Sequence, residues 1–153
     1  MRTYADQPID PARRYRERQG AYAVILDGGD VLVTWEAGER EFQLPGGGID
    51  DGEGPLQALR RECLEETGWQ VRPLRRLGAF QRYTFMPSYD TWAHKVCHIY
   101  LARPVRRIGP PAEDGHAALW MPAATALAKL SVDGDRAFLA RALRLGVPRA
   151  RPA

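Results

Sequence analysis

Short apolar runs separated by glycine-rich turns dominate the first third of the chain. Residues 21–26 (AYAVIL) and 31–35 (VLVTW) are apolar enough for buried strands, and the DGGD turn between them is typical of a hairpin. A short strand, EFQL, follows a second turn. Two further β-rich stretches, residues 71–85 and 93–102, flank the connection MPSYDTW. The pattern therefore predicts a framework made mainly of strands.

Helical periodicity begins directly after this first group of strands. The segment GPLQALRRECLEETG places Leu56, Leu59 and Cys63 at i, i+3 and i+7, which predicts one apolar stripe along a helix. Pro55 suits the first turn, because that position needs no backbone donor. Gly68 suits a left-handed cap at the C-terminal end of the same helix.

The C-terminal part alternates again between loop, strand and helix. RPVRRIGPPAEDG is expected to be a loop, ALWM a short strand, PAATALAKL a short helix and residues 135–145 a second amphipathic helix. This order predicts a mixed α/β layered fold. We expect an irregular N-terminal arm over residues 1–19, one domain over residues 20–147 and a flexible tail over residues 148–153.

Composition narrows the class of protein. The chain has 153 residues, of which 44% are hydrophobic and 27% charged, as is ordinary for a globular domain. No apolar run approaches the roughly 20 residues that span a bilayer, and the N-terminus lacks a signal-like apolar stretch, so we expect a cytoplasmic protein. Cys63 and Cys97 lack the spacing of metal ligands and are expected to be reduced core residues.

The charge of the chain is positive and carried almost entirely by arginine. The formal net charge is +3, and lysine occurs only at positions 95 and 129. Because the arginines are scattered over the whole chain, they give little support for a specific nucleic-acid surface. A modest positive field still favours an anionic substrate.

Three glutamates on the predicted helix carry the first chemical signal. Glu62, Glu65 and Glu66 are spaced i, i+3 and i+4, which places their carboxylates on one side of the helix. Taken alone, such a triplet is compatible with a solvated surface. The glycine-rich segment LPGGGIDDGE runs straight into this helix, however, and a glycine turn exposes backbone carbonyls. Carboxylates and carbonyls together favour a Mg²⁺ site.

Other glycine-rich motifs do not fit the segment. Gly47 and Gly52 have the spacing of a P-loop, but Glu53 stands where that motif needs lysine. Gly46 and Gly48 begin a dinucleotide-binding fingerprint that Asp51 then ends. No calcium-loop pattern is present in the sequence.

The segment resembles a known family signature. Gly47, Glu53 and the run RECLEETGW at residues 61–69 follow the pattern G-x5-E-x7-R-E-U-x-E-E-x-G-U of the MutT-like Nudix hydrolases, with Cys63 and Trp69 at the apolar U positions. The resemblance covers residues 47–69 and implies an α/β/α sandwich with a mixed sheet between helices. It also implies hydrolysis of a nucleoside diphosphate linked to another moiety, with Mg²⁺ or alternatively Mn²⁺.

The resemblance further implies roles for individual residues. Glu65 and Glu66 would be the main metal ligands, with the carbonyl of Gly46 as a further one. Glu62 would be a metal ligand or the base that activates water. The remaining roles concern the loop. Arg61 would pair with Glu53, which would leave Glu62 free to act, whereas Asp50 and Asp51 are expected to be turn residues.

Residues that contact substrate are harder to assign. Polar-loop and catalytic roles are equally compatible with Glu113 and Asp114. Several aromatic residues between positions 80 and 92 could stack on a base or fill the core. No histidine is assigned as a metal ligand, because His94 and His98 would lie roughly 13 Å apart on a strand. The substrate-binding candidates are Arg82, Tyr83, Phe85 and Glu113, with Tyr89 and Trp92 as further stacking candidates.

Two classes of function remain open at this stage. The first is a pyrophosphohydrolase for an ADP-ribose-like sugar nucleotide or a (d)NTP. The second is a non-catalytic nucleotide-binding sensor, against which the intact glutamates argue. We expect a small-molecule nucleotide partner and no membrane or specific nucleic acid, and a homodimer is left open.

Overall fold

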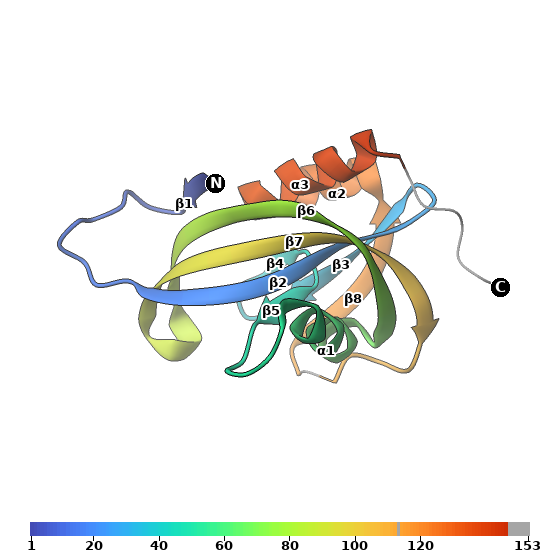
Figure 1. The fold of residues 1–153 in the computed structure, drawn as a ribbon, viewed down its shortest axis with the longest axis horizontal. Helices are drawn as coiled ribbons and strands as arrows, with labels where there is room; N and C mark the ends of the chain where they lie inside the picture. The colour runs from blue at the N-terminus through green and yellow to red at the C-terminus, as the bar shows by residue number, and fades with distance from the viewer. Residues whose placement is uncertain (113, 147–153) are drawn as a thin grey trace.

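A strongly curved mixed sheet forms the middle layer of the molecule, with helices on both faces (Figure 1). The structure is a computed structural model that describes residues 1–112 and 114–146. Helix α1 (Pro55–Thr67) covers one face, while α2 (Ala123–Lys129) and α3 (Asp133–Arg144) lie on the other. This arrangement confirms the expected α/β/α sandwich. No helix in the described part of the chain is long and apolar enough to cross a membrane.

The strand order places parts of the chain that are distant in sequence next to one another. The path is β1-β6-β7-β2-β3-β4, with β5 paired to β2 and β8 paired to β3. Strand β1 runs parallel to β6 and β2 parallel to β7, whereas the other pairs are antiparallel. A 3-10 turn, Pro87–Tyr89, joins β6 to β7. The strands are β1 (Arg2–Ala5), β2 (Arg16–Asp27), β3 (Asp30–Glu36), β4 (Glu41–Gln43), β5 (Gly46–Gly48), β6 (Trp69–Met86), β7 (Thr91–Arg107) and β8 (His116–Pro122).

Helix α1 has the predicted ends but a shifted apolar stripe. Pro55 is its first residue, and Gly68 adopts the left-handed conformation at φ 76°, with its N–H donating to the carbonyl of Leu64 at 2.9 Å. Leu59 and Cys63 are fully buried as expected. Leu56 is 40% exposed, so its assignment to the stripe is wrong. The buried face continues instead toward Thr67, at the i+4 spacing that begins at Leu59.

Two loop predictions are also corrected. Residues 1–19 were expected to be irregular. They contain strand β1 and the beginning of β2, which starts at Arg16. Polar residues are accepted there because β1 is an edge strand with an exposed face. Strand β7 likewise continues to Arg107, through the beginning of the predicted loop. Residues 148–153, expected to be a tail, lie outside the described residues.

Two apolar clusters hold the three layers together. One lies between the sheet and α2 and α3, and it includes Phe80, Cys97 and Leu139. The other lies between the sheet and α1 and includes Leu59 and Cys63. Both cysteines are buried and free, as the sequence predicted. The clusters fix α1 against the sheet, and this packing places the glutamates of α1 beside strand β5.

Candidate active site

The glycines of β5 allow the acidic helix to approach the sheet edge closely. The N–H of Gly46 donates to Glu66 Oε2 at 3.2 Å. A Cβ atom at Gly47 would lie only 2.5 Å from the carboxyl carbon of Glu62. Any side chain at this position would therefore take the space of the Glu62 carboxylate. The sequence predicted a turn here, but the glycine run is a short strand paired with β2.

Arg61 links α1 to the loop that precedes it. Its guanidinium donates to both carboxylate oxygens of Glu53, each at 2.8 Å, and to the carbonyl of Gly48 at 3.1 Å. The expected Arg61–Glu53 pair is therefore present, in the bidentate form that gives the strongest geometry. The hydrogen bonds from Arg61 lower the pKa of Glu53 to about 2, and the same pairing raises the pKa of Arg61.

Arg61 also contacts Glu62, which was expected to be left free, and Glu65. Its Nη1 lies 2.9 Å from Glu62 Oε1 and 3.4 Å from Glu65 Oε2. Among residues 1–112 and 114–146, no three acidic, histidine or cysteine side chains converge as a metal-binding group. The carboxylates repel one another, and the guanidinium stabilises them by lying between Glu62 and Glu65. The expectation that Arg61 leaves Glu62 free is thus wrong for this structure.

The two aspartates of the loop have the turn role that was favoured. The backbone N–H of Asp50 donates to Glu53 Oε1 at 3.0 Å, and the N–H of Glu53 donates to the carbonyl of Asp50 at 3.0 Å. The Asp50 carboxylate is mostly exposed and lies 3.4 Å from Arg61. Asp51 is exposed. Both residues shape the loop that carries Glu53.

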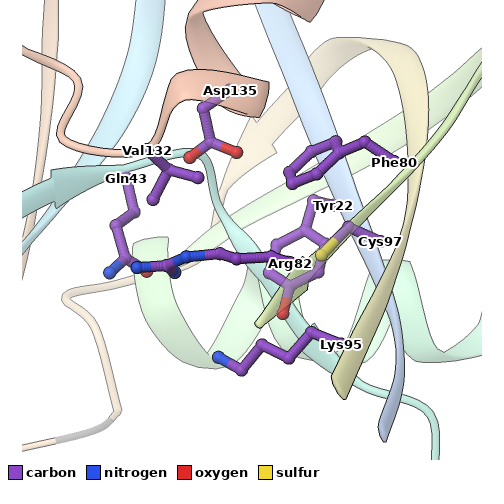
Figure 2. A pocket seen from close by; sticks show the side chains of 8 residues that line it. All are labelled: Tyr22, Gln43, Phe80, Arg82, Lys95, Cys97, Val132 and Asp135. Carbon is purple, nitrogen blue, oxygen red and sulfur yellow. The ribbon is translucent and has the colours of Figure 1, made fainter. Parts of the chain in front are cut away.

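An open cleft of about 780 Å³ runs from these groups across the sheet. The glycines of β5 line it together with Glu62 and Glu66. A small pocket of about 20 Å³, shown in Figure 2, adjoins the cleft and shares Arg82 and Lys95 with it. Arg82 and Lys95 point into this pocket, and Asp135 faces it from the start of α3. The cleft therefore has an acidic end at α1 and basic groups on its sheet floor.

The structure brings only some of the predicted substrate-binding residues to the cleft. Arg82 and Phe85 line it, and so does Tyr89. Tyr83 is not among the lining residues and instead stacks on His94, with ring centroids 4.5 Å apart. Trp92 lies beneath the guanidinium of an arginine from the N-terminal segment. Glu113 lies outside the described residues, and its neighbour Asp114 is exposed.

Several cleft residues had no signal in the sequence. Asp135 is buried, and burial raises the pKa of its carboxyl to about 6, while the backbone N–H of Leu44 donates to its Oδ2 at 3.1 Å. It lies in a helix that periodicity predicted, but periodicity gave no reason for a buried acid. Other cleft residues that sequence reasoning missed include Arg18, Tyr22, Gln43, Lys95 and His116.

The oxygen donors at the acidic end fit a hard divalent cation. Glu62 and Glu66 line the cleft next to the peptide groups of the β5 glycines. Mg²⁺ prefers such oxygen ligands and retains several waters, so it needs only one or two carboxylates from the protein. The space that a Cβ at Gly47 would fill is kept for the Glu62 carboxylate. Gly46 contacts Glu66 through its N–H.

The comparison with protein families agrees with this site. The model of the NUDIX domain matches residues 16–142, which is most of the chain. The protein therefore belongs to the NUDIX domain family. The match begins at the first residue of β2 and ends within α3, so it includes both walls of the cleft.

Individual relatives match over shorter stretches. The chain is 44% identical over 60 residues to an RNA pyrophosphohydrolase of Halorhodospira halophila, covering 39% of this chain and 33% of that protein. It is 36% identical over 83 residues to a CMP-5'-(N-acetyl-N-hydroxy-3-aminopropyl)phosphonate hydrolase of Streptomyces rubellomurinus, covering 53% and 37%. The matches thus span less than half the length of these curated relatives. A NUDIX hydrolase from Nitrosomonas europaea has the same fold, with a TM-score of 0.70 at 21% identity over 88% of this chain and 93% of that one.

Proposed function

We propose that this protein is a Mg²⁺-dependent pyrophosphohydrolase that cleaves the diphosphate of a nucleoside diphosphate linked to another moiety. One observation carries the proposal: Glu62 and Glu66 lie against the glycine strand at one end of a large cleft. A bidentate Arg61–Glu53 pair fixes the helix that bears them. Membership of the NUDIX domain family supports the same chemistry.

The metal would be held by Glu62, Glu65 and Glu66, with the carbonyl of Gly46 as a further ligand. Glu65 contacts Arg61, and 37% of its side chain is accessible. A bound Mg²⁺ or Mn²⁺ supplies neutralisation of phosphate charge and makes water a better nucleophile.

The side chains of Glu62, Arg61 and Glu53 would together orient the reacting water. Glu62, with 14% of its side chain exposed, would accept the proton of the attacking water or serve as a ligand instead. Arg61 keeps the Glu62 carboxylate on the β5 side of the helix through the contact at 2.9 Å. Because Glu53 holds Arg61 from the other side, the pair acts as a positioning unit.

The names of the relatives support a nucleotide joined to a further group. One is an RNA pyrophosphohydrolase and the other a CMP-phosphonate hydrolase. In both names the nucleotide carries a substantial additional moiety. An ADP-ribose-like sugar nucleotide and a (d)NTP are both retained as substrates. A cytoplasmic location and a homodimer are retained only as sequence-based expectations.

A nucleotide-binding sensor without catalysis is the second candidate. It is favoured by the position of Arg61, which contacts both Glu62 and Glu65 and already balances their charge. A protein that keeps this arrangement would bind a nucleotide in the cleft without turnover. The hydrolase candidate predicts phosphate release, whereas the sensor candidate predicts none.

A substrate panel separates them. Purified protein with Mg²⁺ is incubated with ADP-ribose, other sugar nucleotides, diadenosine polyphosphates, 5'-triphosphorylated RNA and each (d)NTP, and the products are separated by chromatography. We expect cleavage of the diphosphate in at least one compound and none after addition of EDTA. Binding by calorimetry without any cleavage would establish the sensor and refute the proposed hydrolase.

A further inference from the structure

Three basic side chains lie next to one another on the floor of the cleft. In the sheet register, Arg82 of β6 stands opposite Lys95 of β7, and Lys95 stands beside Arg18 of β2. Residues paired directly across strands point to the same face, and all three line the cleft. Because neighbouring strands are about 4.8 Å apart, the row spans roughly 10 Å between its outer Cα atoms. We call Arg18, Lys95 and Arg82 the basic row.

The charge of the basic row is only partly compensated. Arg82 Nη2 lies 3.0 Å from Asp6 Oδ2, and Thr84 also donates to that carboxylate. Lys95, by contrast, makes no hydrogen bond or ion pair with any residue in 1–112 or 114–146. Burial, and then the neighbouring Arg82, lower the pKa of Lys95. A cation without a hydrogen-bonded or ion-paired partner in a concave site attracts an anionic ligand.

Arg18 connects the basic row to the acidic end of the cleft. A Cβ at Gly48 would lie 3.7 Å from the guanidinium of Arg18, so this arginine borders strand β5. Its guanidinium also lies 5.2 Å from the ring of Tyr89. Arg82 is two strands farther from β5. Glu36, Glu39 and Glu41 also line the cleft, and their charges repel anions.

We propose that the basic row binds a phosphate group of the substrate other than the diphosphate that is hydrolysed. Arg18 borders β5, and Arg82 lies two strands farther from it, so a phosphate at the Arg82 end of the row would lie away from the diphosphate at the acidic end. A phosphate elsewhere on the nucleotide has this separation from the diphosphate. Examples are a 3'-phosphate and the next phosphodiester of an RNA 5' end. Arginine and lysine together suit its several charged oxygens. This inference rests on the proposed hydrolase activity and names the class of substrate.

Matched substrates test the inference by activity. A compound that the protein cleaves is compared with its 3'-phosphorylated form and with a dinucleotide that carries the same 5' group. We expect kcat/KM to be about 10-fold higher or more for at least one phosphate-bearing form, which is the order of one charge-assisted hydrogen bond. The 3'-phosphate and dinucleotide forms distinguish a small nucleotide from an RNA end. Equal kcat/KM values for all three compounds would overturn the inference but leave the hydrolase intact.

The two lysines of the chain provide a matched pair of variants. Lys95→Met should reduce the preference for the phosphate-bearing form to about 1, because the cation is removed, and thermal melting checks that the variant folds. Lys129→Met makes the same change on α2, where Lys129 lies 5.9 Å from the Phe42 ring and outside the cleft. It should leave the preference unchanged. A preference that survives Lys95→Met would contradict the role of Lys95.

A binding measurement on the unmutated sequence requires neither turnover nor a metal. Reductive methylation with ¹³C-formaldehyde labels both lysines and keeps their charge. Titration with adenosine 3',5'-bisphosphate should shift the Lys95 methyl signal at lower concentration than titration with AMP does. The Lys129 signal should not move. If AMP and the bisphosphate shift the Lys95 signal equally, or neither shifts it, no further phosphate is bound there.

Discussion

The two sides of the cleft are built in different ways. On the α1 side, every charged group of the Glu53–Arg61–Glu62 network has a partner within 3 Å, and all three residues belong to one short segment. On the sheet floor, the basic row comes from three strands, and Lys95 makes no hydrogen bond or ion pair within residues 1–112 and 114–146. The charges of the first side are thus paired within one segment, whereas those of the second side come from separate strands and are only partly paired.

The pKa values show the same contrast. Hydrogen bonds from Arg61 hold the pKa of Glu53 at about 2, so the α1 side stabilises its charged forms. Burial lowers the pKa of Lys95 and raises that of Asp135 to about 6, so the floor penalises charge. An anionic ligand on the floor would therefore gain from a cation that has lost part of its hydration.

Substitution of Gly68 tests how tightly the α1 side is packed. A Cβ there would lie 1.8 Å from the carbonyl oxygen of Gly109, and φ is 76°. We expect Gly68→Ala to lower the free energy of unfolding by about 2–4 kcal/mol, combining left-handed strain with overpacking. Gly28→Ala is the control, because φ is 60° but no atom lies within 4 Å, and it should lose about 1 kcal/mol. Urea denaturation that gives equal losses would contradict the packing.

Adjacent glycines of β5 test the comparison within one strand. A Cβ at Gly47 meets the Glu62 carboxylate at 2.5 Å, whereas the nearest atom to a Cβ at Gly48 is 3.7 Å away. We expect Gly47→Ala to reduce kcat/KM about 100-fold, because it displaces Glu62, with little change in thermal stability. Gly48→Ala should change kcat/KM by less than about 3-fold, since its contact is ordinary. Steady-state kinetics with similar losses in both variants would refute the placement of Glu62.

The pH dependence of stability tests the burial of Asp135 on α3. Asp135 has a pKa of about 6 in the folded chain against 3.8 without burial. The folded state therefore binds the proton more tightly, and this contribution is complete below about pH 4 and is lost as pH rises through 6. We expect wild type to lose about 2 kcal/mol relative to Asp135→Asn between pH 4 and pH 7, measured by urea denaturation. A constant difference between the two proteins would show that Asp135 does not titrate this way.

The same contrast explains what could be predicted from the sequence. The Gly68 cap was predictable from helix geometry, and the Arg61–Glu53 pair was expected from the family resemblance; each lies within one short segment. The basic row was not, because it depends on the register between β2, β7 and β6, which no local pattern specifies. Leu56 was wrongly assigned to the buried stripe, because helical spacing alone does not show where the helix leaves the sheet.

The burial of Asp135 and the contacts of Arg61 were missed for a related reason. Both arise where elements meet: Asp135 receives a hydrogen bond from Leu44, which is far away in sequence. Arg61 was assigned one partner, yet its guanidinium reaches two oxygens of Glu53 and contacts Glu62 and Glu65 as well. Residue spacing predicted which groups would be neighbours, but not how one cation would be shared among them.

The most direct test of the proposed hydrolase is the rate of diphosphate cleavage by Glu66→Gln in the presence of Mg²⁺. Glu66 accepts a hydrogen bond from Gly46 at the acidic end of the cleft, whereas Glu17, on β2, is exposed and does not line the cleft. We predict that Glu66→Gln lowers kcat at least about 100-fold and that Glu17→Gln leaves it unchanged. A folded Glu66→Gln variant with the kcat of wild type would contradict the assignment of this site.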